Sequence, residues 1–369
     1  MGLFYTRSKN LFRFIVYIFL LIAGSSGFAD TISKRVQIYL NLSGYNAGTI
    51  DGIIGPKTRQ SIIVAYNEAG LEFDNIIDEE DLSQLRQIYF NNGRQSWLMN
   101  PLLSKVMDVA DARHFLERTG IGANPFDIQN LVGLPRADAI HALLSQMDGT
   151  VQSSLPDFVF DTDIEYWVRG DYDEPGRQSF RVARDREIAE FRTWWIREMI
   201  ETTKPQNERL LLFWTDHFPV EYSAIDEEAF SIAKQHLMFR QHGFGNFKTL
   251  IKAIIRDPAM LNYLNGENNN KKAPNENLAR ELMELFVLGE GTYDETTVKE
   301  VARALTGKRI NRMKGFEYHL HPRRHDQTTK TLFGKTGHFD GDDLIDILFA
   351  QPTVSHFITE KLWSYYVSE

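Results

Sequence analysis

Apolar residues recur at helical spacing over most of the chain, and turn residues separate the resulting stripes. Between residues 31 and 90 there are three such stripes. Gly44 ends the first, Pro56 suits the first turn of the second, and Asp78 suits the N-cap of the third. The pattern predicts a small bundle of three short amphipathic helices. Its apolar positions are Ile32, Val36, Tyr39, Leu40, Ile62, Ala65, Tyr66, Ala69, Leu82, Leu85, Ile88 and Tyr89.

The remainder of the chain reads as a larger domain of many helices at 106–369, after a linker at 91–105 that is rich in Asn, Gly and Pro. Residues 151–180 hold many Asp, Gly and Pro residues and predict a long loop. Residues 310–340 alternate and contain several glycines, a pattern that allows a short β-hairpin. We therefore predict a mainly α fold. The helical patterns lie at 106–118, 125–131, 135–147, 187–202, 205–218, 227–241, 247–256, 275–288, 296–306, 342–351 and 354–367.

The first 29 residues have the layout of a secretory signal peptide. Arg7, Lys9 and Arg13 precede an apolar run from Phe14 to Gly24, and small residues stand just before Asp30. The run is short for a membrane-spanning helix, which needs about 20 residues. A cleaved signal and an uncleaved anchor are the two interpretations. Both predict an exported protein, in the periplasm or at the cell wall, and cleavage would leave no membrane segment.

The composition of the chain excludes several classes of function. The 369-residue chain carries a net charge of −9, and removing the three leader cations changes this to −12. So acidic a chain is a poor candidate for nucleic-acid binding, which depends on neutralising phosphates. The chain has no cysteine, which excludes disulfides, thiolate metal ligands and a cysteine nucleophile. We find no P-loop, Rossmann glycine set, GxSxG or SxxK motif in a suitable context, and the sequence identifies no cofactor.

A dense motif lies between the first two helices of the predicted bundle. It comprises Gly44 and Tyr45, Gly48, the pair Asp51 and Gly52, and then Gly55, Pro56 and Thr58. This spacing resembles the peptidoglycan-binding-like three-helix domain over about residues 33–67. Asn67 departs from the family, which often has Gln at that place. The resemblance implies that peptidoglycan is the partner of this module. The alternative is that these residues only build the turn, so that the module is a spacer.

The most informative segment of the larger domain is 274–289. Projected at about 100° per residue, Asn277, Arg280, Glu281 and Glu284 share a narrow polar stripe, and apolar residues fill the rest. We therefore expect a helix buried on most sides, whose polar stripe meets either internal partners or a cleft. In the first case Arg280 pairs with the two glutamates. In the second case the stripe belongs to an acidic active site tuned by the arginine.

The histidines add candidates for that site. His217 ends a predicted helix, and His325 precedes Asp326 after His319 and His321. Two nearby carboxylates can serve as acid and base when their pKa values are split. The same carboxylates with His217 or His325 could instead ligate a divalent metal that activates water. The spacing matches no strong metal signature, so metal dependence stays open.

A second resemblance covers nearly all of 110–367. Its motifs begin near Arg113 and include Phe213–Phe218, Arg256–Leu261 and Pro274–Phe286. They continue with Ala302–Gly307, His325-Asp326, Lys330-Thr331, Phe339–Asp343 and Lys361–Trp363. Together they resemble the bacterial domain of unknown function 1800 family. The resemblance implies a mostly helical fold and frequent export, but no established reaction. Family members usually continue beyond the last motif.

Two functions remain open. The first is an exported envelope protein that holds peptidoglycan through its N-terminal module and carries a large domain with an activity such as hydrolysis. The second is a wall-associated binding or assembly protein without catalysis. A solvent-accessible polar stripe facing His217 or His325 favours the enzyme, and a sealed network favours the binding protein.

Overall fold

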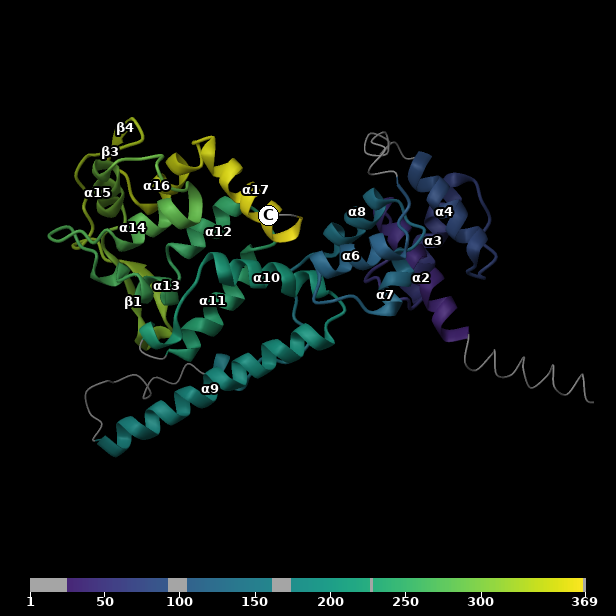
Figure 1. Ribbon diagram of the computed structural model, residues 1–369, viewed down its shortest axis with the longest axis horizontal. Coiled ribbons are helices and arrows are strands. Elements are labelled where there is room, and N and C mark those ends of the chain that lie inside the picture. The colour runs from purple at the N-terminus through teal and green to yellow at the C-terminus, as the bar shows by residue number, and fades with distance from the viewer. Residues whose placement is uncertain (1–24, 92–104, 161–173, 226–227, 368–369) are drawn as a thin grey trace, which may run out of the picture. The chain divides into compact units, whose positions relative to one another are not determined.

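The computed structural model describes residues 25–91, 105–160, 174–225 and 228–367 (Figure 1). The fold is mainly helical, as predicted, and its only described sheets are two antiparallel hairpins of two strands. Both hairpins lie within or just before the region 310–340, where one was expected. The chain divides into two compact units, residues 1–147 and 148–369. The predicted signal sequence and linker lie almost wholly outside the described residues.

Unit 1 is built around its first helix, α2 (Ser25–Leu42), which packs against four other helices of the unit. Val36, Tyr39 and Leu40 on this helix are almost fully buried, in agreement with the predicted apolar stripe. The Tyr39 hydroxyl donates to Asp138 at 3.3 Å. The helices of unit 1 are α2 (Ser25–Leu42), α3 (Pro56–Ala69), α4 (Glu79–Asn91), α6 (Val109–Thr119), α7 (Pro125–Leu131) and α8 (Arg136–Gln146).

Helices α6 to α8 share one apolar core with α2 to α4. Leu134 and Ala139 are as buried as Ile62 and Leu85 of the predicted three-helix bundle. In addition, the Arg35 guanidinium of α2 donates to carbonyl oxygens near the end of α7, including that of Gln129 at 3.2 Å. This division differs from the boundary expected at 91–105, because residues 106–147 pack with the N-terminal helices.

Unit 2 contains the remaining helices, of which α9 is the longest (Figure 1). Residues 174–180 belong to α9, so this end of the predicted loop 151–180 is helical instead. The helices are α9 (Glu174–Glu201), α10 (Pro205–His217), α11 (Ala229–His242), α12 (Phe247–Ile254), α13 (Pro258–Tyr263), α14 (Asn277–Glu281), α15 (Glu295–Ala304), α16 (Gly341–Leu348) and α17 (Thr353–Tyr366), with a π-helix η6 (Leu282–Val287) and 3-10 turns η2 (Asp157–Val159), η4 (Tyr222–Ile225), η5 (Gly266–Asn268) and η7 (Arg312–Lys314).

A buried ion pair joins α10 to α11 in unit 2. The Arg240 guanidinium donates to both carboxylate oxygens of Glu208, at 3.0 and 2.8 Å. Both side chains are at least 97% buried. Trp195 donates to the same carboxylate at 2.8 Å, and Arg240 Nε donates to His236. Because every charge in this interior cluster has a partner, the cluster fixes how the two helices pack.

The two hairpins are short and follow α15. Strand β1 (Lys308–Asn311) pairs with β2 (Glu317–Leu320), and β3 (Lys330–Leu332) pairs with β4 (Lys335–Gly337). Strand β3 contacts α15 (Figure 1). No helix among the described residues is long and apolar enough to cross a membrane.

Candidate functional site

The predicted polar-striped helix is interrupted by a π-helix. Helix α14 ends at Glu281 and η6 continues from Leu282 to Val287. The Leu288 amide donates to the carbonyl of Met283, five residues back, at 2.8 Å. A projection at 100° per residue therefore fails in the second half of the segment. Burial of Leu282, Met283, Phe286 and Val287 agrees with the prediction, whereas Leu285 is 45% exposed.

Glu281 and Glu284 lie close together on this segment and are both partly exposed. Burial raises the pKa of Glu281, and the nearby negative charge of Glu284 raises it further. Neither carboxylate makes a hydrogen bond or ion pair with another described residue. The ring of Tyr293 is a neighbour, since burial and then the charge of Glu284 raise the pKa of its phenol. The pair is thus open to solvent and electrostatically coupled.

Arg280 does not pair with these glutamates. Its guanidinium donates to both carboxylate oxygens of Glu295 on α15 at 2.9 Å, and to Glu276 at 3.2 Å. The expected internal network of Arg280 with Glu281 and Glu284 is therefore wrong. The planar guanidinium of Arg280 joins α14 to α15. Its positive charge affects Glu281 only at a distance, by lowering the pKa of that carboxyl.

His217 is a core residue. Its ring is 93% buried among Phe213, Phe218 and other aromatic rings. Nε2 lies 3.1 Å from the carbonyl oxygen of Phe286 in η6. Burial lowers the pKa of His217 to about 4, although the hydrogen bond to this carbonyl opposes the shift. The imidazole is therefore neutral at pH 7 and holds the π-helix in place, rather than facing the glutamates.

His325 and Asp326 belong to another network, which unites three of the sequence motifs. His325 Nδ1 lies 2.9 Å from the carbonyl oxygen of Thr306, and the Thr306 hydroxyl accepts the amide of Asp326 at 2.8 Å. Arg303 Nε donates to the Asp326 carboxylate at 2.8 Å. The Lys330 ammonium donates to the backbone carbonyl oxygen of Asp326 at 2.5 Å. Burial disfavours the Asp326 charge, but hydrogen bonds from Arg303 and Thr328 hold its pKa far below the usual range.

Gly307 explains why the Thr306-Gly307 pair accompanies His325. Its φ is +84°, and a Cβ placed there would lie 2.8 Å from the backbone nitrogen of His325. Any side chain at this position would push the two segments apart. The Arg303–Asp326 network is therefore well suited to fastening the second hairpin region to α15.

The structure thus brings Glu281 and Glu284 together, but links neither to His217 or to His325 by any interaction among described side chains. The part of the chain that the structure describes also contains no group of three or more His, Asp or Glu side chains arranged to hold a metal ion. The single composite site expected from the sequence is not assembled here.

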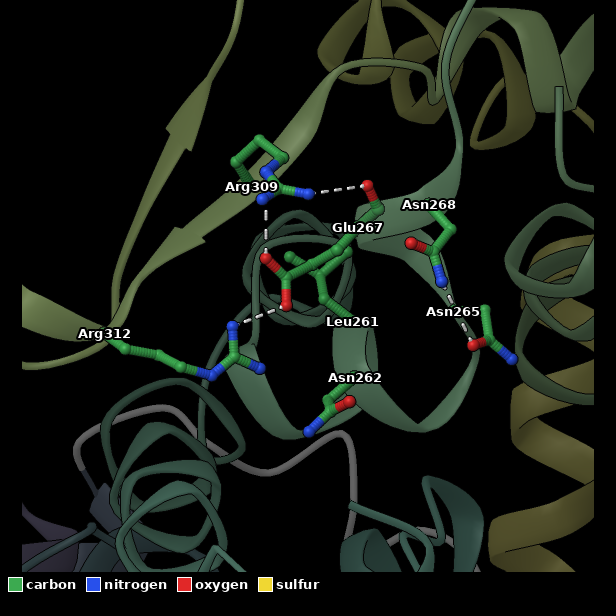
Figure 2. Close-up of a pocket in the computed structure, with 7 residues that line it drawn as sticks. All are labelled: Leu261, Asn262, Asn265, Glu267, Asn268, Arg309 and Arg312. Carbon is green, nitrogen blue, oxygen red and sulfur yellow. Dashed lines mark hydrogen bonds and ion pairs between the residues drawn. The ribbon is translucent and has the colours of Figure 1, made fainter. Parts of the chain in front are cut away.

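Sequence reasoning missed a polar pocket of about 210 Å³ in unit 2. It lies between α13, η5 and the strand β1, and Figure 2 shows Glu267 with its carboxylate directed toward two arginines. The signal in the sequence was the Asn-rich run 262–270 followed 40 residues later by Arg309, but such runs ordinarily indicate turns. The lining residues are Leu261, Asn262, Asn265, Glu267, Asn268, Arg309 and Arg312.

Lys308 was also missed. The side chain is 97% buried and makes no hydrogen bond or ion pair with a described residue; its ammonium nitrogen lies 5.1 Å from the ring centroid of Tyr318. Burial lowers the pKa of Lys308 to about 7, and the charge of Arg256 adds to this shift. Gly341 at the start of α16 leaves room for the amine, because a Cβ there would lie 3.1 Å from it.

Residues 114–369 match the family described as protein of unknown function (DUF1800). The match covers more than half of the chain, and the protein belongs to this family. It begins inside α6, so the family region includes α7 and α8 of unit 1 as well as all of unit 2. No curated protein and no solved structure matches the chain.

Proposed function

We propose that the protein is exported to the cell envelope and binds peptidoglycan through the loop between α2 and α3. The observation that carries the proposal is a loop fixed by one buried amide. The Gln37 side chain donates to Asp51 Oδ1 at 2.9 Å and to the Ile53 carbonyl at 3.1 Å, and it accepts the amide of Gly52 at 2.9 Å. This loop carries the motif that resembles peptidoglycan-binding modules.

The internal bonds of the loop separate supporting residues from residues available to a ligand. Thr58 is buried and donates to the carbonyl of Ala47 at 3.1 Å, and the Asp51 carboxylate also accepts the amide of Ile53 at 2.8 Å. Ile53 itself is 69% exposed. A loop ordered in advance loses little conformational freedom on binding, which favours a recognition role over a flexible connection.

Export is supported by the layout of residues 1–29. N-terminal sequencing of the protein recovered from the envelope fraction should begin at Asp30. A cytoplasmic chain that still begins at Met1 would argue against the whole envelope assignment.

Wall binding is tested by co-sedimentation of the purified chain with peptidoglycan sacculi. Ile53→Asp should reduce the pelleted fraction several-fold, because it places a charge on the exposed apolar tip of the loop. Val109→Asp is the matched control, since Val109 is also an exposed apolar residue of unit 1, at 49%, outside the loop. If wild type stays in the supernatant at low and moderate salt, the module is a spacer.

Hydrolysis by the family domain is the second candidate, and the Glu281–Glu284 pair favours it. A carboxyl whose pKa is raised beside a second carboxyl group is the arrangement that acid–base catalysis uses. Release of soluble fragments from sacculi, abolished by Glu281→Gln, would support this activity. Binding without any release, in wild type and variant alike, would favour a non-catalytic assembly role.

A further inference from the structure

The pocket between α13, η5 and β1 has a wall that is already bonded within the protein. Glu267 Oε2 accepts from Arg312 Nη1 at 2.8 Å, and Oε1 accepts from the Ile310 amide at 3.0 Å. The Glu267 carbonyl oxygen accepts from Arg309 and from Arg324, each at 3.3 Å. Both carboxylate oxygens thus accept hydrogen bonds from the protein, so Glu267 positions the arginines instead of binding a ligand.

The groups left over are mostly hydrogen-bond donors. Arg312 uses Nε and Nη1 on Glu228 and Glu267, which leaves Nη2 without a bond to any described residue. Arg309 likewise has Nη2 free among the described residues. Asn265 accepts from Asn268 through Oδ1 at 3.4 Å, and its amide nitrogen points away from the arginines in Figure 2. A pocket offering donors selects a ligand that supplies acceptor oxygens.

The charge of the lining and the volume of the pocket indicate the charge and the size of the ligand. Of the residues that line the pocket, Arg309 and Arg312 are cationic and Glu267 is anionic, so the lining carries one excess positive charge. This balance suits a monoanion, and Glu267 in the wall disfavours a dianion such as phosphate. The volume of 210 Å³ lies below the roughly 300–1,000 Å³ of drug-sized sites, so the ligand is small.

Local backbone geometry keeps the pocket open. Asn265 has a φ of +55°, in the left-handed region that Asn tolerates better than most residues. The next residue, Gly266, packs so closely that a Cβ would lie 2.7 Å from the Leu261 side chain. In Figure 2, Asn265 and Asn268 lie across the pocket from Arg309 and Arg312. The Asn268 oxygen is directed toward the arginines, so the hydrogen-bond donors that face the pocket come from the arginine side.

We propose that this pocket binds the carboxylate of a small monoanionic ligand, with the free guanidinium hydrogens of Arg309 and Arg312 as donors. A planar carboxylate matches the planar fork of arginine. The amide oxygen of Asn262, whose nitrogen donates to the Ile225 carbonyl at 3.3 Å, is placed to accept from a hydroxyl or amino group next to that carboxylate. The site lies in unit 2, so it does not depend on peptidoglycan docking by the loop of unit 1.

The test is an NMR or calorimetric titration of the full chain with matched probes. N-acetylalanine should bind and N-acetylalaninamide should not, since the amide lacks the charge. N-acetyl-alanylalanine and lactate, both monoanions, distinguish a peptide carboxylate from a free hydroxy acid, and binding of either supports the site. Equal binding of acid and amide, tighter binding of inorganic phosphate, or no carboxylate bound at about 10 mM would overturn it.

Variants locate the binding in the pocket. Arg309→Met should weaken carboxylate binding at least about tenfold, the effect of losing a charge-assisted hydrogen bond. Arg309→Lys keeps the charge, removes the planar donor fork and should weaken binding several-fold, which covers the case that Arg309→Met alters the hairpin. Arg186→Met is the control, since Arg186 is an exposed arginine of α9 that pairs with Glu190, far from the pocket residues in sequence. Unchanged affinity in both pocket variants, or an equal loss in the control, would contradict the assignment.

Discussion

His217 Nε2 lies 3.1 Å from the carbonyl oxygen of Phe286, and this contact joins α10 to the π-helix η6 across 69 residues of sequence. A π-turn leaves carbonyl groups out of the regular i→i−4 ladder, and such a group needs another donor when it is buried. The neutral imidazole supplies that donor from inside an aromatic cluster. The histidine is therefore part of the reason that the segment carrying Glu281 and Glu284 departs from α-helical geometry.

This contact predicts a pH dependence of stability. The folded-state pKa of His217 is about 4, below the usual value near 6.5, so the unfolded chain takes up a proton that the folded chain refuses. The contribution is present above pH 6.5 and is lost as the pH falls toward 4, by up to about 3 kcal/mol. Urea unfolding from pH 7 to 4.5 should show this loss, and His217→Gln should reduce it. An identical slope in the variant would refute the assignment.

Breaking the Arg240–Glu208 pair should be costly. Glu208→Gln leaves the Arg240 charge buried with a neutral partner, and we expect about 3–5 kcal/mol of destabilisation in urea unfolding. Glu190→Gln is the control, because its ion pair with Arg186 is on the surface and should contribute less than about 1 kcal/mol. Similar losses in both variants would show that the buried network is not special.

The apolar pattern predicted most of the helices because burial of one face is local in sequence. The stripes at Val36, Leu40, Ile62 and Leu85 became core positions, since each helix shows its neighbours the same face in every turn. The unit boundary could not be predicted this way. Whether 106–147 packs on α2 depends on contacts such as those of Arg35 with the end of α7, which link residues nearly 100 positions apart.

The candidate site was predicted less well, because most of its contacts also join residues that are far apart in the sequence. Proximity of Glu281 and Glu284 follows from their spacing, so it was found. The partners of Arg280, His217 and Asp326 come from elsewhere in the chain, and composition does not encode them. The pocket could not be predicted because an Asn-rich run ordinarily indicates only a turn, and the arginines beside it come from β1 and η7, which are distant in sequence.

The shared core of unit 1 makes truncation informative. A fragment of residues 30–147 should unfold cooperatively, whereas 30–90 should not, because α7 and α8 cover one side of α2. Circular dichroism during thermal unfolding distinguishes the two. A cooperative transition in the shorter fragment would restore the boundary near residue 91.

Glu284→Gln separates a structural from a functional role of the glutamate pair. Since the carboxylate of Glu284 makes no hydrogen bond with a described residue, stability should change by less than about 0.5 kcal/mol. The pKa of Glu281 should fall toward its normal value, because the like charge that raises it is gone. Carboxyl NMR titration measures this shift, and thermal unfolding measures stability. A large loss of stability with no pKa shift would end the catalytic interpretation.

Lys308 predicts a pH dependence of the same sign as that of His217, but at alkaline pH. Its pKa of about 7 in the folded chain lies below the usual value near 10.5, so folding expels a proton between these pH values. Below pH 7 the full cost of burying the ammonium is present, and stability should rise as the pH increases from 7 toward 10. Contact with the Tyr318 ring at 5.1 Å offsets only part of that cost.

Lys308→Met keeps the length of the side chain and removes its charge, so the variant should be more stable than wild type at pH 6, by several kcal/mol. The difference should shrink as the pH rises to 10, because wild type then holds a neutral amine in the same space. Urea unfolding at pH 6, 8 and 10 measures both effects. Lys335→Met on β4 is the control, since Lys335 is exposed and its replacement should leave the pH profile unchanged. A constant difference between Lys308→Met and wild type across this range would mean that the amine is hydrated and charged in the folded protein.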